Sequence, residues 1–466
     1  LGAAENVTGS RFLVESGNSR NLVDCGLYQE RNFLSRNWED FAVAPSSIEN
    51  VFLTHAHLDH CGYLPKLVKS GFRGGIFCTP PTREIAQIIL LDSAKIQEED
   101  AINKRARHQR EGRRGTHPEI PLYTVEDAKN VFPLFRTIPY KEPTQVSPEI
   151  KVTLHNAGHI LGAATIELEA TERVAAGFSL RQKTAVFSGD IGRWDRPIVE
   201  DPALPKKADY LFMESTYGDR LHEAETDSVS QFKKIIVETQ NRGGNVVIPV
   251  FATERAQDLL YYLSILLRTN QIKPVPVFID SPMAINITDV FRKFTGYLDA
   301  ETKALIEKGE SPFNFPQLKI SRTTEESKTI NSTKGTSIIL AGSGMCTGGR
   351  VKYHIRENIT RPESAILFVG YQAQGTLGRE ITEGAKKIRI FNETYPVRAR
   401  IENVGGFSAH ADQKELLRWV SGFEKPPEKI FVIHGEKETA VKFADTLRRN
   451  IKSDVVIPKY LQEVIL

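Results

Sequence analysis

The chain has 466 residues, of which 40 % are hydrophobic and 26 % charged, and its formal net charge is +3. These values are ordinary for a soluble globular protein, and the length predicts two or three folding units. The net charge is too small to indicate a nucleic-acid binder by itself, and no apolar stretch reaches the length of a membrane span.

The four cysteines bear on the cellular compartment. Cys25, Cys61, Cys78 and Cys346 are dispersed and show no paired spacing. The sequence therefore supports neither a disulfide framework nor a structural zinc knuckle. No signal peptide is recognisable before the first predicted strand, so we expect a reducing, cytoplasmic location.

Two apolar runs near the N-terminus lead into polar, chemically active residues. Residues 21–23 lead into Asp24, and residues 51–53 lead into the hexapeptide 55–60, which reads His-Ala-His-Leu-Asp-His. A helical pattern begins at Leu64, so the hexapeptide is predicted on a strand-to-helix loop. Burying so many polar groups without partners would cost on the order of several kcal/mol, so the hexapeptide is not a core element.

The spacing within the hexapeptide indicates two adjacent metal sites. His55 and His57 should point the same way on an extended loop, whereas Asp59 and His60 turn toward a second point. The alternative is a solvated surface loop that is rich in histidine.

A long polar helical stretch is predicted from about residue 92 to 112. It carries a run of basic residues within eleven positions: Lys104, Arg105, Arg107, Arg110, Arg113 and Arg114. Such a run could hold phosphates electrostatically. It could equally be a solvated helix face, balanced by Glu98, Glu99, Asp100 and Glu111.

Further candidate ligands follow later apolar runs. The run 152–154 leads into His155 and His159, the run 184–188 into Asp190, and the run 430–433 into His434. Strand ends beside glycine are where open sheets place functional groups. The glycines around His159 favour it as the ligand, which leaves His155 as a strand residue or a hydrogen-bond donor to a ligand.

The pattern of predicted helices and strands changes near residue 218. Longer helical patterns then alternate with parallel-type strands at 245–250, 276–279, 337–340 and 365–368. This α/β block closes near Pro396, and residues 398–401 are expected to return to the first domain. The predicted division is therefore 1–217 and 396–466 for one discontinuous domain and 218–395 for an inserted one.

The order of these motifs resembles that of the metallo-β-lactamase-fold hydrolases. Segments 214–218, 406–412 and 432–436 match motifs A, B and C of the β-CASP group of nucleic-acid nucleases within that fold. The likeness is greatest to the bacterial and archaeal RNA-processing members and to the endonuclease subunit of the cleavage and polyadenylation specificity factor. It covers essentially the whole chain and begins at residue 2. It implies an α/β fold, an αββα metallo-β-lactamase sandwich with an inserted α/β β-CASP domain of mostly parallel sheet.

The resemblance also implies how the ligands are divided. One Zn²⁺ takes His55, His57 and His159, a second takes Asp59, His60 and His434, and Asp190 bridges both. Asp24 is placed outside the ligand shell, where it orients a ligand loop, or it simply caps a turn. Imidazole ligands with few carboxylates suit zinc, although ligand type leaves manganese open.

The resemblance further implies a proton donor for the leaving group. His410 takes that role with Glu214 orienting it, and Asp59 is counted with them among the catalytic residues. Read without the family, Glu214 could be a simple cap.

Glycine-rich loops could cradle RNA phosphates through backbone N–H groups, although tight-turn chemistry explains such loops nearly as well. The candidates there are Ser343, Gly344, Thr376, Arg379 and Ser408.

These expectations together predict a zinc-dependent ribonuclease. A hydroxide bridging two metals would attack the phosphodiesters of single-stranded RNA in an interdomain cleft, in endonucleolytic or 5′-exonucleolytic fashion. The alternatives are a DNA nuclease, another hydrolase of this fold, or a catalytically silent RNA-binding subunit. No membrane partner is expected, and the chain acts either alone or as a homodimer.

Overall fold

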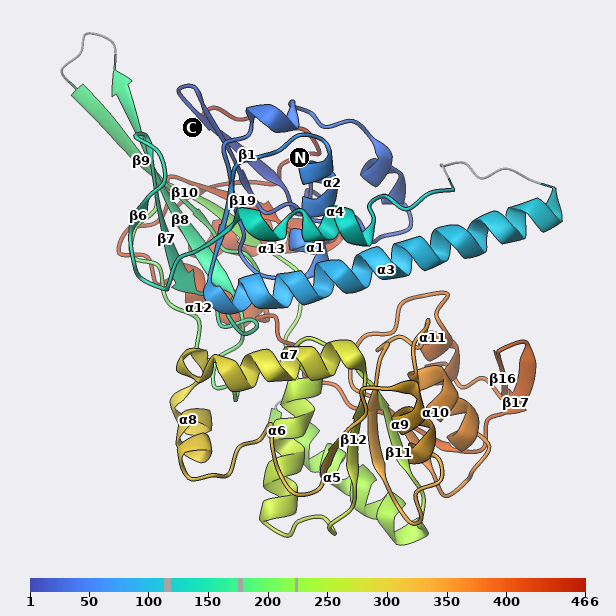
Figure 1. Ribbon diagram of the computed structural model, residues 1–466. Helices are drawn as coiled ribbons and strands as arrows, with labels where there is room; N and C mark the ends of the chain where they lie inside the picture. The colour runs from blue at the N-terminus through green and yellow to red at the C-terminus, as the bar shows by residue number, and fades with distance from the viewer. Residues whose placement is uncertain (113–118, 175–178, 223–224) are drawn as a thin grey trace. The chain divides into compact units, whose positions relative to one another are not determined.

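The computed structural model describes residues 1–112, 119–174, 179–222 and 225–466 (Figure 1). The chain folds into two compact units. Unit 1 comprises residues 1–195, 201–221 and 410–466, and unit 2 comprises residues 196–200 and 222–409.

Unit 1 contains two sheets. Their orders are β1-β2-β3-β4-β5 and β20-β19-β10-β9-β8-β7-β6. The strands of the first sheet are β1 (Phe12–Ser16), β2 (Ser19–Val23), β3 (Asn50–Phe52), β4 (Gly75–Cys78) and β5 (Phe135–Thr137). Those of the second are β6 (Thr144–Gln145), β7 (Ile150–Asn156), β8 (Ala164–Val174), β9 (Ser179–Phe187), β10 (Tyr210–Glu214), β19 (Lys429–Ile433) and β20 (Asp454–Val456).

Alternation along β10 explains why the second sheet is covered on both faces. Leu211 and Met213 belong to one core cluster, while Tyr210 and Phe212 contact another. The latter cluster joins the two sheets, because it contains Phe52 of the first sheet together with strand residues of the second. Since side chains alternate between faces, one five-residue strand supplies both cores.

Helices cover the outer faces of the sandwich. Trp419 of α12 (Gln413–Val420) and Leu447 of α13 (Lys437–Asn450) pack into the outer core of the second sheet. On the side of the first sheet lie α1 (Leu58–Cys61), α2 (Leu64–Lys69), α3 (Pro80–Glu111) and α4 (Val125–Lys129), and α3 runs alongside α4 (Figure 1). Short 3₁₀ turns span η1 (Leu34–Trp38), η2 (Pro45–Ser47) and η3 (Phe132–Leu134). The predicted αββα sandwich is confirmed.

Unit 2 is built on a six-stranded sheet in the order β13-β12-β14-β11-β15-β18, in which every pairing is parallel. Strands β11, β14 and β15 are buried along their whole length, as expected for a sheet covered on both faces. The strands are β11 (Val246–Pro249), β12 (Val277–Asp280), β13 (Leu318–Ile320), β14 (Ile338–Ala341), β15 (Ala365–Phe368) and β18 (Arg400–Asn403). This confirms the predicted α/β insert with mostly parallel strands.

The helices of unit 2 connect these parallel strands. They are α5 (Glu225–Arg242), α6 (Arg255–Arg268), α7 (Pro282–Lys293), α8 (Ala300–Glu307), α9 (Thr324–Ile330), α10 (Val351–Asn358) and α11 (Leu377–Thr382), with a 3₁₀ turn at η4 (Thr295–Tyr297). A separate antiparallel hairpin consists of β16 (Lys387–Ile390) and β17 (Glu393–Pro396).

The compact units differ from the predicted boundaries at three places, the first being residues 218–221, which lie with unit 1 and not with the insert. Residues 396–409 lie with unit 2, because β18 pairs in parallel with β15 and so extends the sheet of the insert. Residues 196–200 also belong to unit 2, where Asp299 donates a backbone hydrogen bond to Ile198 at 2.9 Å. Residues 398–401 therefore do not return to the first domain.

The structure describes the state of the cysteines and the character of the helices. The cysteines at 25, 61, 78 and 346 all lie in described parts of the chain, and each is buried with a free thiol. Among the described residues, no helix is both long enough and apolar enough to cross a membrane.

Candidate metal centre

The hexapeptide follows β3, as predicted, but its second half is helical. His57 is the N-cap of α1, and Asp59 and His60 lie within that helix. The predicted loop is therefore confined to residues 53–57. The short helix carries Asp59 and His60, which fall in a different group of candidate ligands from His55 and His57.

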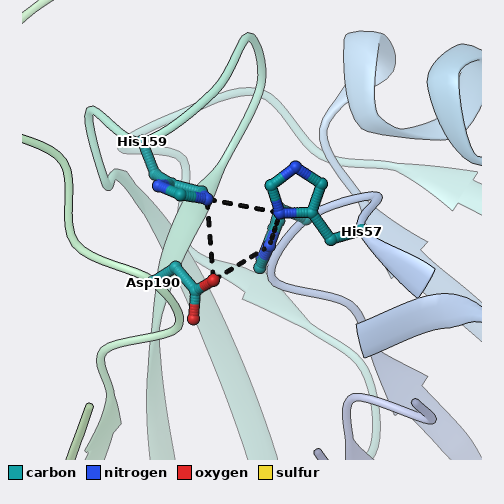
Figure 2. A group of neighbouring side chains, drawn as sticks. His57, His159 and Asp190 are labelled. Atoms are coloured by element: carbon teal, nitrogen blue, oxygen red, sulfur yellow. Dashed lines mark hydrogen bonds and ion pairs between the residues drawn. The ribbon is translucent and has the colours of Figure 1, made fainter. Parts of the chain in front are cut away.

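The first group gathers His55, His57, His159 and Asp190, whose ligand atoms all lie within 4.8 Å of one another. His57 Nδ1 lies 3.0 Å from His55 Nε2 and 3.3 Å from His159 Nε2. Asp190 Oδ2 lies 3.4 Å from His55 Nε2 and 3.5 Å from His159 Nε2. Figure 2 shows His57, His159 and Asp190 converging on one point from separate parts of unit 1.

The second group gathers Asp59, His60 and His434. His60 Nε2 lies 3.0 Å from His434 Nε2, which lies 3.5 Å from Asp59 Oδ2. The other oxygen of Asp190, Oδ1, lies 3.3 Å from His60 Nε2. Asp190 thus presents one oxygen to each group.

These distances fit a divalent metal. Four ligands at roughly 2.0–2.1 Å from a tetrahedral ion stand roughly 3.4 Å apart, which is close to the separations within the first group. Asp190 Oδ1 is buried and accepts no hydrogen bond from the described residues. A buried carboxylate oxygen without a donor is costly, so its burial is understandable if a cation takes the place of the donor.

Three of the imidazoles are held through their other ring nitrogen. His60 Nδ1 lies 2.7 Å from Asp24 Oδ2, His55 Nδ1 lies 3.0 Å from Thr54 Oγ1, and His434 Nδ1 lies 3.1 Å from Thr216 Oγ1. Such contacts fix the tautomer and ring orientation of a metal ligand.

Sequence reasoning anticipated Asp24 but missed the two threonines. Asp24 also accepts a hydrogen bond from the Thr54 backbone at 2.8 Å, so it joins the ends of β2 and β3. The position of Thr54 directly before His55 was the available signal. No comparable signal marked Thr216, because it lies far from His434 in sequence.

The pKa values of the first group favour neutral imidazoles. Burial and the nearby charge of His60 lower the pKa of His55 to about 4, while burial and His55 lower that of His57 to about 3. Burial also lowers the pKa of His159 well below its ordinary value. A metal ligand must be deprotonated, so these three nitrogens are available to a cation at neutral pH.

The backbone near the two groups adopts conformations that most side chains avoid. Gly189 has a φ of +59°, and a Cβ there would lie 2.9 Å from the Thr54 Cβ. His434 itself has a φ of 51°. A non-glycine residue in the left-handed region is uncommon, and such strain gathers at functional sites.

Glu214 and His410 come together beside this cluster. His410 Nδ1 lies 3.4 Å from Glu214 Oε2, and His410 Nε2 lies 3.9 Å from Asp190 Oδ2. Glu214 Oε1 accepts a hydrogen bond from the Ile191 backbone at 2.6 Å, which fixes the carboxylate. Burial lowers the pKa of His410, but the charges of Glu214 and Asp190 outweigh it and raise that pKa to about 10.

Glu214 could also contribute to a cation site, since it forms a third group with Asp190 and His434. The side chain of His410 is 21 % exposed, whereas that of Glu214 is fully buried. His410 is therefore partly open to solvent, and Glu214 lies beside its imidazole in the interior. His155 is set apart on β7, where its Nε2 lies 3.0 Å from Glu167 Oε2.

The candidate phosphate-binding residues follow strands of unit 2. Ser343 and Gly344 follow β14, Thr376 and Arg379 lie after β15, and Ser408 follows β18. The first two loops are joined, because Gly378 donates a backbone hydrogen bond to Met345 at 3.1 Å and Gln372 donates to Gly344 at 3.1 Å. The carboxyl ends of parallel strands share one edge of a sheet.

Thr376 and Arg379 have local roles within this edge. Thr376 caps α11, and Arg379 donates to Glu383 at 2.7 Å.

The predicted basic run lies on α3, where Arg105, Arg107 and Arg110 are exposed. Arg113 and Arg114 of that run lie outside the described residues.

Comparison with protein families gives three matches in chain order. Residues 13–174 match the metallo-beta-lactamase superfamily domain, residues 256–381 the Beta-Casp domain, and residues 394–458 the Zn-dependent metallo-hydrolase RNA specificity domain. A solved structure of a protein of unknown function from Enterococcus faecalis V583 has a TM-score of 0.54 and 13 % identity, covering 98 % of this chain and 96 % of that one. This likeness supports the fold alone.

Several curated proteins are similar along most of the chain. Ribonuclease TTHA0252 of Thermus thermophilus is 36 % identical, over 94 % of this chain and 93 % of the relative. Transcription termination factor FttA of Methanocaldococcus jannaschii is 33 % identical, over 100 % of this chain and 70 % of the relative. The RNase J-like protein of the same organism is 31 % identical, over 98 % and 96 %. The chain therefore belongs to the β-CASP family of metallo-β-lactamase-fold proteins.

Proposed function

We propose that this protein is a metal-dependent ribonuclease that hydrolyses phosphodiester bonds of single-stranded RNA. The observation that carries the proposal is the carboxylate of Asp190, whose two oxygens face two groups of imidazoles, with His410 beside them. Paired cations close together are typical of phosphodiester-cleaving enzymes.

Two zinc ions per chain are the proposed cofactors. His55, His57 and His159 would hold one and Asp59, His60 and His434 the other, with Asp190 shared. When bound, such a pair of cations supplies Lewis acidity and activates water for attack on a phosphodiester. The predominance of imidazole ligands supports zinc.

The residues around the ligands would keep the centre in shape. Asp24, Thr54 and Thr216 each hold one imidazole by the nitrogen that faces away from the proposed ion. Removing such a partner typically costs tenfold to a hundredfold in metal affinity or activity.

His410 is the proposed proton donor to the leaving oxygen. Its raised pKa means that the imidazole carries a proton at neutral pH, and its Nε2 lies on the side of Asp190. Glu214 holds Nδ1 and so directs that proton toward the site. Phosphodiester cleavage leaves an alkoxide, which needs such a donor.

RNA is proposed over other esters because of the relatives and of unit 2. The most similar of the curated proteins above is named a ribonuclease, and residues 394–458 match an RNA specificity domain. The joined loops after β14 and β15 offer backbone N–H groups to phosphates, with Ser343, Gly344, Thr376, Arg379 and Ser408 as candidate contacts. A silent RNA-binding subunit is disfavoured, since the candidate ligands lie close enough together to hold a cation.

Incubation with circular and end-labelled single-stranded RNA tests this function. The zinc-loaded protein should cleave RNA, and cleavage of the circle would establish endonucleolytic action. A 5′-exonuclease would degrade only the linear RNA. If the protein cleaves neither RNA but cleaves single-stranded DNA, the DNA nuclease alternative replaces the proposal.

Location and assembly are separate proposals. The buried free thiols support a reducing, cytoplasmic environment. Whether the chain acts alone or as a homodimer is a question for sedimentation measurements.

A further inference from the structure

Unit 2 carries a pair of exposed aromatic side chains that the proposed chemistry does not use. Tyr353 on α10 is 48 % exposed, and Phe391 at the tip of the β16–β17 hairpin is 41 % exposed. Their ring centroids lie 4.5 Å apart at an interplanar angle of 35°. Large exposed aromatic side chains in contact with each other mark interaction sites more often than isolated ones do.

The hairpin holds Phe391 at a backbone cost. Ile390 pairs with Glu393, so Phe391 and Asn392 form a two-residue turn, with φ values of 50° and 68°. A turn with both φ values positive is of type I′, which prefers Asn-Gly. Phenylalanine is disfavoured in this conformation, and backbone strain of this kind gathers where a side chain has a function.

The core beneath fixes both rings. Ile388 and Ile390 of the hairpin and Val351 and Ile355 of α10 are buried in one cluster. Tyr353 and Phe391 are therefore presented from rigid elements.

Two basic side chains, Lys352 and Arg356, lie beside the rings. Lys352 Nζ lies 5.2 Å from the Phe391 ring centroid, and Arg356 Cζ lies 5.6 Å from that of Tyr353. On β16, Lys387 and Arg389 are exposed, because Ile388 and Ile390 between and after them point into the core. The carboxylates nearby are Glu357, which pairs with Arg356 at 2.7 Å, and Glu393, which accepts from Tyr395. Lys352 thus places a positive charge beside the Phe391 ring.

We infer that Tyr353 and Phe391 form a stacking platform for the bases of single-stranded RNA, flanked by cations that hold its phosphates. Every base offers a π-face, so this combination binds single strands with little sequence preference. The inference rests on the proposed ribonuclease function and adds to it a contact surface on unit 2, apart from the metal ligands in unit 1.

The size of the surface argues against a protein partner. Fully buried aromatic side chains contribute about 150–250 Å² each, so two half-exposed rings fall well short of the roughly 800 Å² per partner in a stable protein interface. They match one or two nucleotide bases.

The test compares Phe391→Asn with Phe391→Tyr in the zinc-loaded protein. Asn removes the ring and suits the turn, so its unfolding midpoint should not fall, whereas Tyr keeps the ring. Binding of a labelled 20-nucleotide RNA is measured by fluorescence anisotropy on ice, and the RNA is checked to be intact afterwards. We expect Phe391→Asn to weaken binding by about fivefold to a hundredfold and Phe391→Tyr to bind like wild type. Tyr353→Leu should weaken binding as well.

An abasic oligonucleotide of the same length separates stacking from charge. It should bind wild type and Phe391→Asn equally, because it has no base to stack. If Phe391→Asn loses as much affinity for the abasic strand as for the RNA, the inference is overturned. It is also overturned if wild type binds the RNA and Phe391→Asn binds it equally well. If Phe391→Asn and wild type sediment differently without RNA, the rings belong to a contact between copies of the chain, and the inference is likewise overturned. If wild type fails to bind any RNA, the proposed function fails first.

Discussion

Asp190 shows how far single residues could be assigned from sequence. Its place after an apolar run and a glycine marked it as a candidate, and the structure puts one of its oxygens near each imidazole group. The candidate ligands of the hexapeptide were predicted from their spacing, because all lie within six residues. Thr216 was missed because its contact with His434 joins residues 218 positions apart. Such pairings depend on the fold and not on local spacing.

Substitution of His410 should separate proton donation from metal binding. His410→Ala should keep its metal and its RNA affinity but lose cleavage by roughly 10²–10⁴-fold, the usual contribution of a general acid. His434→Ala, the matched control, should lose metal and activity together, because His434 belongs to one of the candidate ligand groups. Elemental analysis and single-turnover cleavage provide the measurements.

The leaving group decides what His410 does. The loss in His410→Ala should shrink sharply on a nitrophenyl phosphodiester, because nitrophenolate leaves without a proton. An equally large loss on both substrates would mean that His410 positions the scissile phosphate and does not protonate the leaving oxygen.

Glu214 should set the alkaline limit of activity. A proton donor works only below its pKa, so cleavage should fall as pH rises through the pKa of His410, which the charge of Glu214 raises. Glu214→Gln removes this negative charge, lowers that pKa, and should move the alkaline fall in kcat/KM to lower pH. Coincident alkaline limbs in the two proteins would show that His410 is not the titrating acid.

At the scale of elements, the apolar patterns predicted where strands lie better than they predicted which strands pair with each other. The strands β11, β12, β14 and β15 were expected within one or two residues of their observed bounds. The strand β18 was expected in the wrong unit, because an apolar run carries no information on the strand with which it pairs. The helix α1 was read as loop, since four residues are too few to show a helical period.

The basic run on α3 gives a prediction at this scale. Replacing Lys104, Arg105, Arg107 and Arg110 with glutamine should weaken RNA binding and lower the slope of log affinity against log salt by about 0.7 for each phosphate that the protein no longer neutralises. Anisotropy titrations over a series of salt concentrations measure both quantities. An unchanged slope would show that the run is a solvated helix face, paired with acids of the same helix.

At the scale of the whole molecule, the site is built from distant parts of one unit. The candidate ligands run from His55 to His434, and residues 222–409 of unit 2 interrupt unit 1. The sequence predicted this discontinuity, because His410 and His434 follow the insert. It placed residues 396–409 in the first domain, whereas β18 joins the sheet of unit 2.

The metal content of Asp190→Ala tests the central claim most directly. If one carboxylate serves two sites, wild-type protein purified without chelator should hold close to two zinc ions per chain, and Asp190→Ala should lose occupancy at both positions. Elemental analysis under saturating zinc gives the number. A fully loaded Asp190→Ala protein, or a wild-type chain that holds a single metal, would contradict the account.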